Sequence, residues 1–251
     1  MIRRPPRSTR KESSAASDVY KRQTENGGAD ADGTVFGLSP KPPGGCPSGS
    51  YTGNGWCEAI LHSFAGYPKD GNYPSGTPVL DSAGNVYGTT VYGGKGNCDS
   101  DLGCGTVWKL TPGNAGEYTG EVLESFKSGP IIIGCCFPIR LPDNPWAGVV
   151  LDSSGNIYGM TEYGGSSSYC IDEKLKSNQQ GCGMVFELAR RPKRTDYIDD
   201  LLWVFSLTDG AHPVTGLILD GGNLYGTTYN GGLSDFCPYP DGCGVAFEFT
   251  P

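Results

Sequence analysis

The sequence predicts an all-β protein, built as a β-propeller-like array of four-stranded antiparallel blades that forms an incomplete propeller. Two observations predict it. Short apolar runs of about 4 to 8 residues, rich in Val, Leu, Phe and Tyr, recur along the chain, and no segment of useful length has a helical period. The chain also has 40 glycines and 19 prolines, and the glycines recur in register, which favours folded structure over disorder.

An internal repeat defines the blades. A segment with two strand candidates occurs three times, at 77–94, 147–165 and 215–232. Each copy is followed by a cysteine-containing loop and a closing strand, at 103–112, 181–190 and 242–251, and a fourth closing strand lies at 33–40. One more apolar run separates the copies, at 59–64, 121–126 and 201–206. Each unit therefore offers four strands.

This arrangement makes residues 24–251 the repeat domain. We expect two complete blades and two partial ones, which are a partial blade at 33–64, blades at 77–126 and 147–206, and a partial blade at 216–251. Propellers usually contain at least four blades, so the array is incomplete on this count. An open array leaves strand edges that favour self-association.

The first two strands of each unit are joined by a tight turn. In Asp81–Asn85, the Asp and Asn side chains can bond backbone N–H groups while Gly84 adopts a positive φ. The same turn is expected at 152–156 and 220–223. The glycine that follows each strand tyrosine is expected to permit close approach of a neighbouring sheet, at Gly88, Gly159 and Gly226.

Residues 1–23 differ in composition from the rest of the chain. They hold 7 of the 19 Lys and Arg residues and only two acids, and they lack the apolar core of a secretory signal. A basic arm for nucleic acid or anionic lipid is one interpretation. The segment also resembles translated sequencing-adapter read-through, and we therefore expect it to be non-native or disordered.

The remainder of the chain is acidic, with 12 Lys and Arg against 25 Asp and Glu, a net charge of −13. Such a field repels polyanions, so no nucleic-acid partner is expected. The one basic cluster, at 190–194, lies between two repeats and is interpreted as a solvated linker. No stretch is apolar enough for a transmembrane segment.

The ten cysteines favour disulfides in an oxidising compartment, since the chain has two histidines and no short zinc-knuckle spacing. Three pairs occupy the same loop of successive units, and a fourth pair precedes them. The predicted bonds are Cys46–Cys57, Cys98–Cys104, Cys170–Cys182 and Cys237–Cys243. Cys135 and Cys136 are left over, and three alternatives remain open for them: a strained vicinal bridge, a bond to a part of the protein missing from this sequence, and free thiols.

LDGGNLYGTT at 219–228 and GTVWKLTP at 105–112 resemble the GloVer-type extracellular tandem repeat, and the resemblance covers nearly all of residues 27–251. A DG-x-x-P element of this repeat appears at 70–74 and 209–213, whereas an insert around 131–145 replaces it in the second unit. The resemblance implies a propeller, export to the extracellular space or cell surface, and no established activity. The signal peptide that export requires is missing from this sequence.

No catalytic constellation is visible, and we expect a non-enzymatic protein without a cofactor or metal. The acids in register, Asp81, Asp152 and Asp220, each have a turn role. His62 and His212 occupy non-equivalent positions. Calcium ligation through Asp70 and Asp209 is a weaker alternative, because their spacing is not that of an EF-hand loop. A carbohydrate-active propeller, either a glycoside hydrolase or lyase fragment or its sugar-binding module, is the alternative function.

The favoured function is a secreted or cell-surface scaffold with a binding or structural role, whose ligand the sequence does not identify; a carbohydrate and an extracellular protein are the two ligand classes considered. Tyr92, Tyr163 and Asn230 begin the disulfide-bounded loops, where aromatic side chains suit sugar stacking or protein contact. The competing interpretation is that these residues pack against the adjoining loop. The four tryptophans are expected to lie in the core rather than on a ligand platform, at Trp56, Trp108, Trp146 and Trp203.

Overall fold

The computed structural model describes residues 20–251 except 48–49, 54, 97, 99–101, 128–129, 134–136, 167–169, 171–180, 192–196, 233–236 and 238–241. Its strands form five small antiparallel sheets. The one helical element within this part of the chain is the 3-10 turn η1, Asn114–Gly116. The prediction of an all-β protein is therefore confirmed.

Four of the sheets follow the repeat and are numbered by their order along the chain. The first sheet has the order β1 (Tyr20–Thr24), β2 (Thr34–Pro40), β4 (Trp56–Ser63) and β3 (Tyr51–Gly53). The second is β5 (Gly71–Leu80), β6 (Val86–Gly93), β7 (Thr106–Pro112) and β8 (Tyr118–Ser125). The third is β11 (Val150–Leu151), β12 (Ile157–Thr161), β14 (Met184–Arg190) and β15 (Tyr197–Val204). The fourth is β16 (Ile218–Asp220), β17 (Asn223–Thr227) and β18 (Ala246–Phe249).

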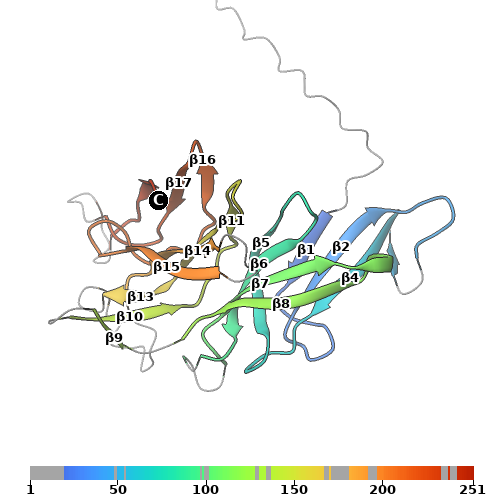
Figure 1. The fold of residues 1–251 in the computed structure, drawn as a ribbon, viewed down its shortest axis with the longest axis horizontal. Coiled ribbons are helices and arrows are strands. Elements are labelled where there is room, and N and C mark those ends of the chain that lie inside the picture. The colour runs from blue at the N-terminus through green and yellow to red at the C-terminus, as the bar shows by residue number, and fades with distance from the viewer. Residues whose placement is uncertain are drawn as a thin grey trace, which may run out of the picture.

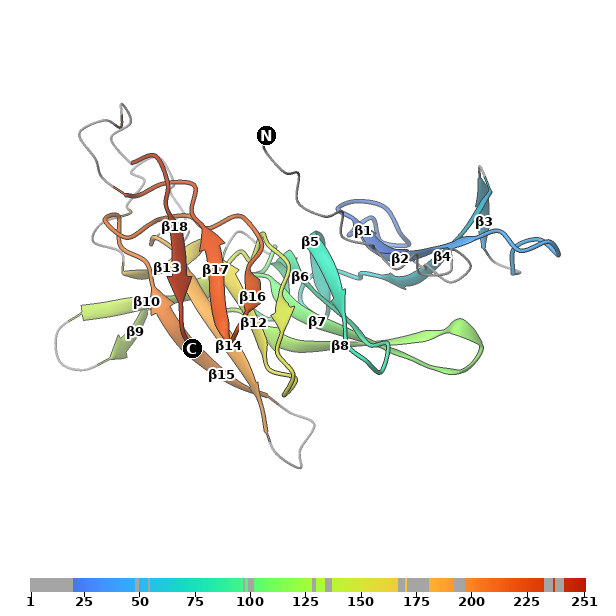
Figure 2. The same ribbon diagram turned by 90° about the horizontal axis from the view of Figure 1, so that it is seen from above.

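The first sheet lies at one end of the molecule and the second sheet is beside it, whereas the third and fourth sheets lie together towards the other end (Figure 1, Figure 2). A fifth sheet lies beside the third and is formed largely by the insert of the second unit. Its order is β13 (Tyr163–Ser166), β10 (Phe137–Asp143) and β9 (Pro130–Ile133). Cys135 and Cys136 lie outside the described residues.

The hydrophobic core is divided among the spaces between consecutive repeat sheets. Three clusters of buried side chains fill these spaces, and each draws residues from two sheets. An aromatic pair crosses each space at 5.2 to 5.7 Å between ring centroids, namely Phe64–Trp108, Phe126–Phe186 and Phe205–Phe247. Since every unit buries its apolar face on the next, the repeat sheets depend on one another for stability.

The glycine after each strand tyrosine has a different role from the one expected. A Cβ on Gly88 would lie 2.3 Å from the Trp108 ring, and one on Gly159 would lie 2.3 Å from the Phe186 ring. Gly88 and Trp108 are cross-strand partners in the same sheet. The prediction of close approach by a neighbouring sheet is therefore wrong. The glycine makes room for an aromatic ring of its own sheet, and that ring receives the Phe of the preceding unit.

A proline closes each contact between consecutive units. The δ-carbon of Pro74, Pro145 or Pro213 lies against a positive-φ glycine, which is Gly33, Gly105 or Gly183 respectively. The residue before each proline donates its backbone N–H to the residue before that glycine, in Tyr73 to Asp32, Asn144 to Cys104 and His212 to Cys182, at 2.8 to 3.0 Å. We call these contacts the proline junctions. The insert at 131–145 therefore does not abolish the junction of the second unit, because its last residues occupy the same position.

One sequence boundary needs adjustment. Tyr20–Gln23 pair with β2 as part of β1, so the expectation of disorder for 1–23 does not hold for these four residues. Thr24 in the first sheet is equivalent to Thr90 in the second. The Thr24 hydroxyl bonds the Thr34 hydroxyl at 2.9 Å, as the Thr90 hydroxyl bonds that of Thr106 at 2.7 Å. The residues that precede Thr24 therefore extend the same strand towards the N-terminus. Residues 1–19 lie outside the described residues.

Tryptophan positions also differ from the expectation. Trp108 is buried, but Trp56 is 38% exposed and Trp203 is 45% exposed, and Trp146 is half-buried. The core prediction is therefore wrong for Trp56 and Trp203. Trp203 lies on β15 facing the fourth sheet, which has one strand fewer than the others, so less apolar surface covers it.

Disulfides join Cys46 to Cys57, Cys98 to Cys104, Cys170 to Cys182 and Cys237 to Cys243. The last three close the loop that precedes the closing strand of each unit. Cys104 and Cys182 are fully buried, and their carbonyls accept the N–H groups of the proline junctions. These bonds therefore fix the loops on which the next unit docks.

Candidate ligand-binding site

Three strained residues mark the proline junctions. Tyr73, Asn144 and His212 precede the junction prolines and have positive φ values of 62°, 54° and 52°. A residue with a Cβ rarely adopts this conformation, and the residue before proline favours an extended backbone. Such strain costs on the order of 1 to 3 kcal/mol and clusters at functional sites. The strain belongs to the geometry of all three junctions, and two of the three residues, Tyr73 and His212, carry aromatic rings.

The two rings belong to a larger group that we call the aromatic belt, which consists of Tyr73, Tyr92, Trp146, Glu162, Tyr163 and His212. Tyr73 lies edge-on to Tyr92 at 6.0 Å and to Trp146 at 5.9 Å. Tyr163 lies edge-on to His212 at 5.5 Å. All six side chains are half-buried. Residues from three consecutive units therefore present a row of partly exposed rings.

Glu162 connects the two halves of the belt. Burial raises the pKa of Glu162 above its ordinary value, and the nearby Tyr163 hydroxyl and Trp146 indole oppose the shift because they favour the ionised carboxylate. Burial also raises the pKa of Tyr163, and the negative charge of Glu162 adds to this effect. Burial therefore disfavours ionisation of both side chains.

The sequence identified part of this belt. Tyr92 and Tyr163 belong to it. Tyr92 packs against the junction residue Tyr73, and Tyr163 packs against the junction residue His212. Asn230 is not an aromatic residue, and its backbone pairs with that of Ala211, the residue before His212, at 2.8 and 2.9 Å. Tyr73, Trp146, Glu162 and His212 were missed. The aromatic residue before proline in two DG-x-x-P elements was the available signal for Tyr73 and His212.

The turn acids are occupied by the roles that the sequence assigned to them. The Asp81 carboxylate accepts hydrogen bonds from the N–H groups of Ala83 and Asn85, the Asn85 amide and the Tyr87 hydroxyl, at 2.7 to 3.0 Å. Asp152 accepts the equivalent four bonds at 2.8 to 3.3 Å. Burial opposes ionisation of Asp81, but these bonds outweigh it, so the pKa of Asp81 lies below its ordinary value. Neither carboxylate is arranged to exchange protons with a substrate.

The fourth sheet varies this turn. Asp220 and Asn223 are directly paired across a shorter connection. Asn223 and Tyr225 donate instead to the Glu248 carboxylate, at 2.6 and 2.9 Å. A carboxylate on the closing strand therefore replaces the one in the turn.

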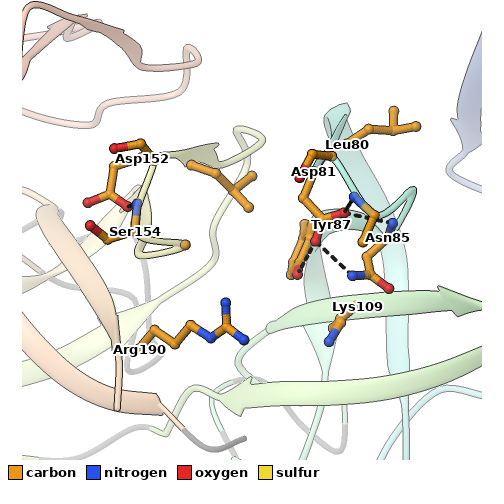
Figure 3. Close-up of a pocket in the computed structure, with 13 residues that line it drawn as sticks. Leu80, Asp81, Asn85, Tyr87, Lys109, Asp152, Ser154 and Arg190 are labelled. Carbon is orange, nitrogen blue, oxygen red and sulfur yellow. Dashed lines mark hydrogen bonds between the residues drawn. The ribbon is translucent and has the colours of Figure 1, made fainter. Parts of the chain in front are cut away.

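A polar hollow of about 550 Å³ lies between the turns of the second and third sheets. Figure 3 shows the two turns on opposite sides, with Arg190 extending between them and Lys109 on the facing sheet. The Lys109 ammonium lies 5.9 Å from the centre of the Tyr87 ring, and Lys109 is the cross-strand partner of Tyr87. In the third and fourth sheets the cross-strand partner of the equivalent tyrosine is a glutamate, Glu187 or Glu248. The hollow therefore has two cations that the repeat does not supply elsewhere.

A second polar hollow, of about 630 Å³, contains His62 and Asp70. Their side chains are 2.8 Å apart, and Asp70 also accepts the N–H groups of Ala65 and Gly71. Asp209 likewise accepts the N–H and hydroxyl of Ser206. The two acids proposed as calcium ligands therefore order their own loops. No group of three or more His, Cys, Asp or Glu side chains in the described part of the chain is placed to hold a metal ion.

Comparisons with known proteins give one solved structure. No protein-family model and no curated protein matches the chain. An inulosucrase from Halalkalicoccus jeotgali, solved with kestose bound, matches with 16% identity and a TM-score of 0.40, over 99% of this chain and 68% of the inulosucrase chain. A likeness at this level assigns neither fold nor activity. Among the helices of the described residues, none has the length and hydropathy to cross a membrane.

Proposed function

We propose that this chain is an extracellular or cell-surface repeat scaffold of the GloVer type, with propeller-like blades, and that it binds carbohydrate through the aromatic belt. The observation that carries the proposal is the row of half-buried rings that three consecutive units bring together around Glu162. Tyrosine and tryptophan combine an apolar ring face with a polar group, which suits the apolar face and hydroxyl groups of a sugar.

Two further features support binding rather than turnover, and a third supports an extracellular location. The turn acids are saturated by local hydrogen bonds, so they offer no free acid–base pair. The strained residues Tyr73 and His212 are held in place by buried junctions, which pre-organises the rings. Four disulfides are typical of proteins that function outside the reducing cytosol.

A glycan array followed by titration of the strongest ligand tests the proposal. We expect Trp146→Ala and Tyr92→Ala each to weaken binding about tenfold or more, because each removes one stacking surface. Trp56→Ala is the matched control, since Trp56 is exposed at the first sheet, away from the belt, and should leave affinity unchanged. Binding that survives both belt substitutions would contradict the proposal.

A second candidate function, action on a polysaccharide, rests on the His62–Asp70 pair. His62 stands where the second and third sheets have Glu124 and Trp203, so it departs from the repeat as a catalytic group would. The pair lies in a hollow that also contains Glu121 and Lys95. Incubation with the glycans that bind, followed by analysis of reducing ends, tests it. Turnover that His62→Ala abolishes would favour an enzyme, and absence of turnover would leave the binding scaffold.

A further inference from the structure

The polar hollow between the turns of the second and third sheets contains two residues that depart from the repeat. Lys109 on β7 stands where the third and fourth sheets have a glutamate. Arg190 on β14 stands where the first and second sheets have Pro40 and Pro112. Residues that only build a repeat recur from unit to unit, so two departures that meet in one hollow indicate a function beyond the packing of the units.

The turn of the third sheet holds the Arg190 side chain at the hollow. A Cβ on Gly155 would lie 3.2 Å from Nη1 of Arg190 and 3.3 Å from its Cδ, so the side chain lies over the turn glycine. The Arg190 backbone N–H donates to the Asn156 side chain at 2.9 Å and joins this end of β14 to the same turn. The Arg190 side chain therefore extends between the two turns (Figure 3).

Lys109 and Arg190 are both available to a ligand. Neither forms an ion pair with a carboxylate in the part of the chain that the structure describes. Asp81 and Asp152 also line the hollow, but each carboxylate accepts four hydrogen bonds from its own turn, and these donors offset part of its charge. Lys109 is half-buried beside the Tyr87 ring, so water screens its charge less than that of a fully exposed lysine.

The remaining polar groups of the hollow define the ligand further. Ser82, Ser153 and Ser154 line it and are exposed, so a ligand can reach their hydroxyls. A guanidinium binds a carboxylate through two parallel hydrogen bonds, and a lysine ammonium adds a point charge. Serine hydroxyls can donate hydrogen bonds to sugar hydroxyls and accept them in return. The net charge of −13 on residues 24–251 repels a long polyanion, which favours a short ligand with one carboxylate.

We propose that this hollow binds a short saccharide that carries one carboxylate, such as a uronic acid. Arg190 and Lys109 bind the carboxylate, and the three serines bind the ring hydroxyls. The hollow lies at the opposite end of β5 and β6 from the aromatic belt, because Tyr92 pairs with Asn72 at one end of these strands and the turn follows Leu80 at the other. It is therefore a second site, which goes beyond the proposed function and does not depend on it.

Titration of the full chain with glucuronate and with galacturonate, followed by amide resonances, tests the proposal. We expect at least one uronate to give saturable shifts at residues 82–84 and 153–155, with the indole resonance of Trp146 unmoved. Glucose and galactose, which have a hydroxymethyl group in place of the carboxylate, should bind about tenfold or more weakly, and so should acetate and sulfate, which lack the ring hydroxyls. Equal affinity for a neutral sugar or a simple anion would overturn the proposal, as would the absence of binding by both uronates.

Variants of the two cations locate the site. Lys109→Glu introduces the residue type that the third and fourth sheets have at this position, so the fold accommodates it, and Arg190→Gln removes the charge but keeps a polar side chain. Each variant should weaken uronate binding about tenfold or more. Lys41→Gln is the matched control and should leave the affinity unchanged, because Lys41 is exposed and does not line the hollow.

Uronate binding that either variant at the hollow leaves unchanged would overturn the proposal. Binding of a neutral glycan at Trp146 should persist in Lys109→Glu, because the aromatic belt lies at the other end of the strands. Failure of this site and failure of the proposed function are therefore distinguishable.

Discussion

The ring of Phe126 lies edge-on to the ring of Phe186 at 5.2 Å and joins the second sheet to the third. Both side chains are at most 1% exposed, so Phe126→Ala leaves a cavity between the two sheets. We expect a loss of about 3 to 5 kcal/mol in the free energy of unfolding, measured by chemical denaturation. Trp56→Ala, at an exposed ring, should cost less than about 1 kcal/mol. Equal losses for the two variants would contradict serial packing of the sheets.

The hydrogen bonds that the Asp81 carboxylate accepts should contribute measurably to the free energy of unfolding. Asp81→Ala removes four hydrogen bonds and should cost about 1 to 2 kcal/mol, since the donors regain water in a partly exposed turn. Asp220→Ala is the matched control, because the neighbouring polar groups of that turn donate to Glu248 instead. A loss for Asp220→Ala as large as that for Asp81→Ala would show that the bonds at Asp81 contribute little.

The same turn predicts a pH dependence with a definite sign. Burial opposes ionisation of Asp81 and of Asp70, but hydrogen bonds outweigh it, and for Asp70 the contact with His62 adds to them, so both pKa values lie below normal. A lowered folded-state pKa gives stability that is complete above the unfolded pKa of about 4 and is lost as pH falls through the folded value. Asp81→Asn should flatten the acid limb of a stability–pH curve, and an unchanged limb would contradict this.

We expect the pH dependence of stability that arises from Glu162 to have the opposite sign to that from Asp81. Because burial raises its folded-state pKa, the ionised carboxylate destabilises the fold at neutral pH and this penalty disappears as pH falls below the unfolded value of about 4.3. Glu162→Gln retains an acceptor for Trp146 and Tyr163 and should raise the melting temperature at pH 7 but not at pH 4. A variant that is less stable at pH 7 would show that the carboxylate charge itself holds the belt.

Removal of two equivalent loop disulfides, Cys98–Cys104 and Cys237–Cys243, should lower the free energy of unfolding by different amounts. Replacing Cys98 and Cys104 by serine should cost about 2 to 3 kcal/mol in the chain-entropy model and should also loosen the junction at Cys104. The Cys237 and Cys243 pair closes a loop of the same length but bears no filled junction, so its removal should cost only the entropic part. Native-state hydrogen exchange at Asn144 separates the two, and equal exchange there in both variants would contradict a junction role.

The internal repeat allowed the strands of each sheet to be predicted from the sequence. The aromatic belt could be predicted only in part, because it is formed by contacts between consecutive units. Tyr87 and Asp81 lie within one hairpin, so local turn chemistry was sufficient to place them. Trp146 and Glu162 meet only because the insert of the second unit ends in Asn144 and Pro145 at a proline junction, which a one-dimensional pattern does not reveal. Trp203 was misplaced for a similar reason, since its exposure depends on a strand missing from the next sheet.

The most direct test of carbohydrate binding is the indole N–H resonance of Trp146 during titration with the oligosaccharide selected by the glycan array. Trp146 is the belt residue that contacts both Tyr73 and Glu162. The proposed function predicts a saturable shift of this resonance, lost in Tyr92→Ala and Tyr163→Ala and preserved in Trp56→Ala. Saturable binding that leaves the Trp146 resonance unmoved would place the ligand elsewhere and contradict the aromatic belt as its site.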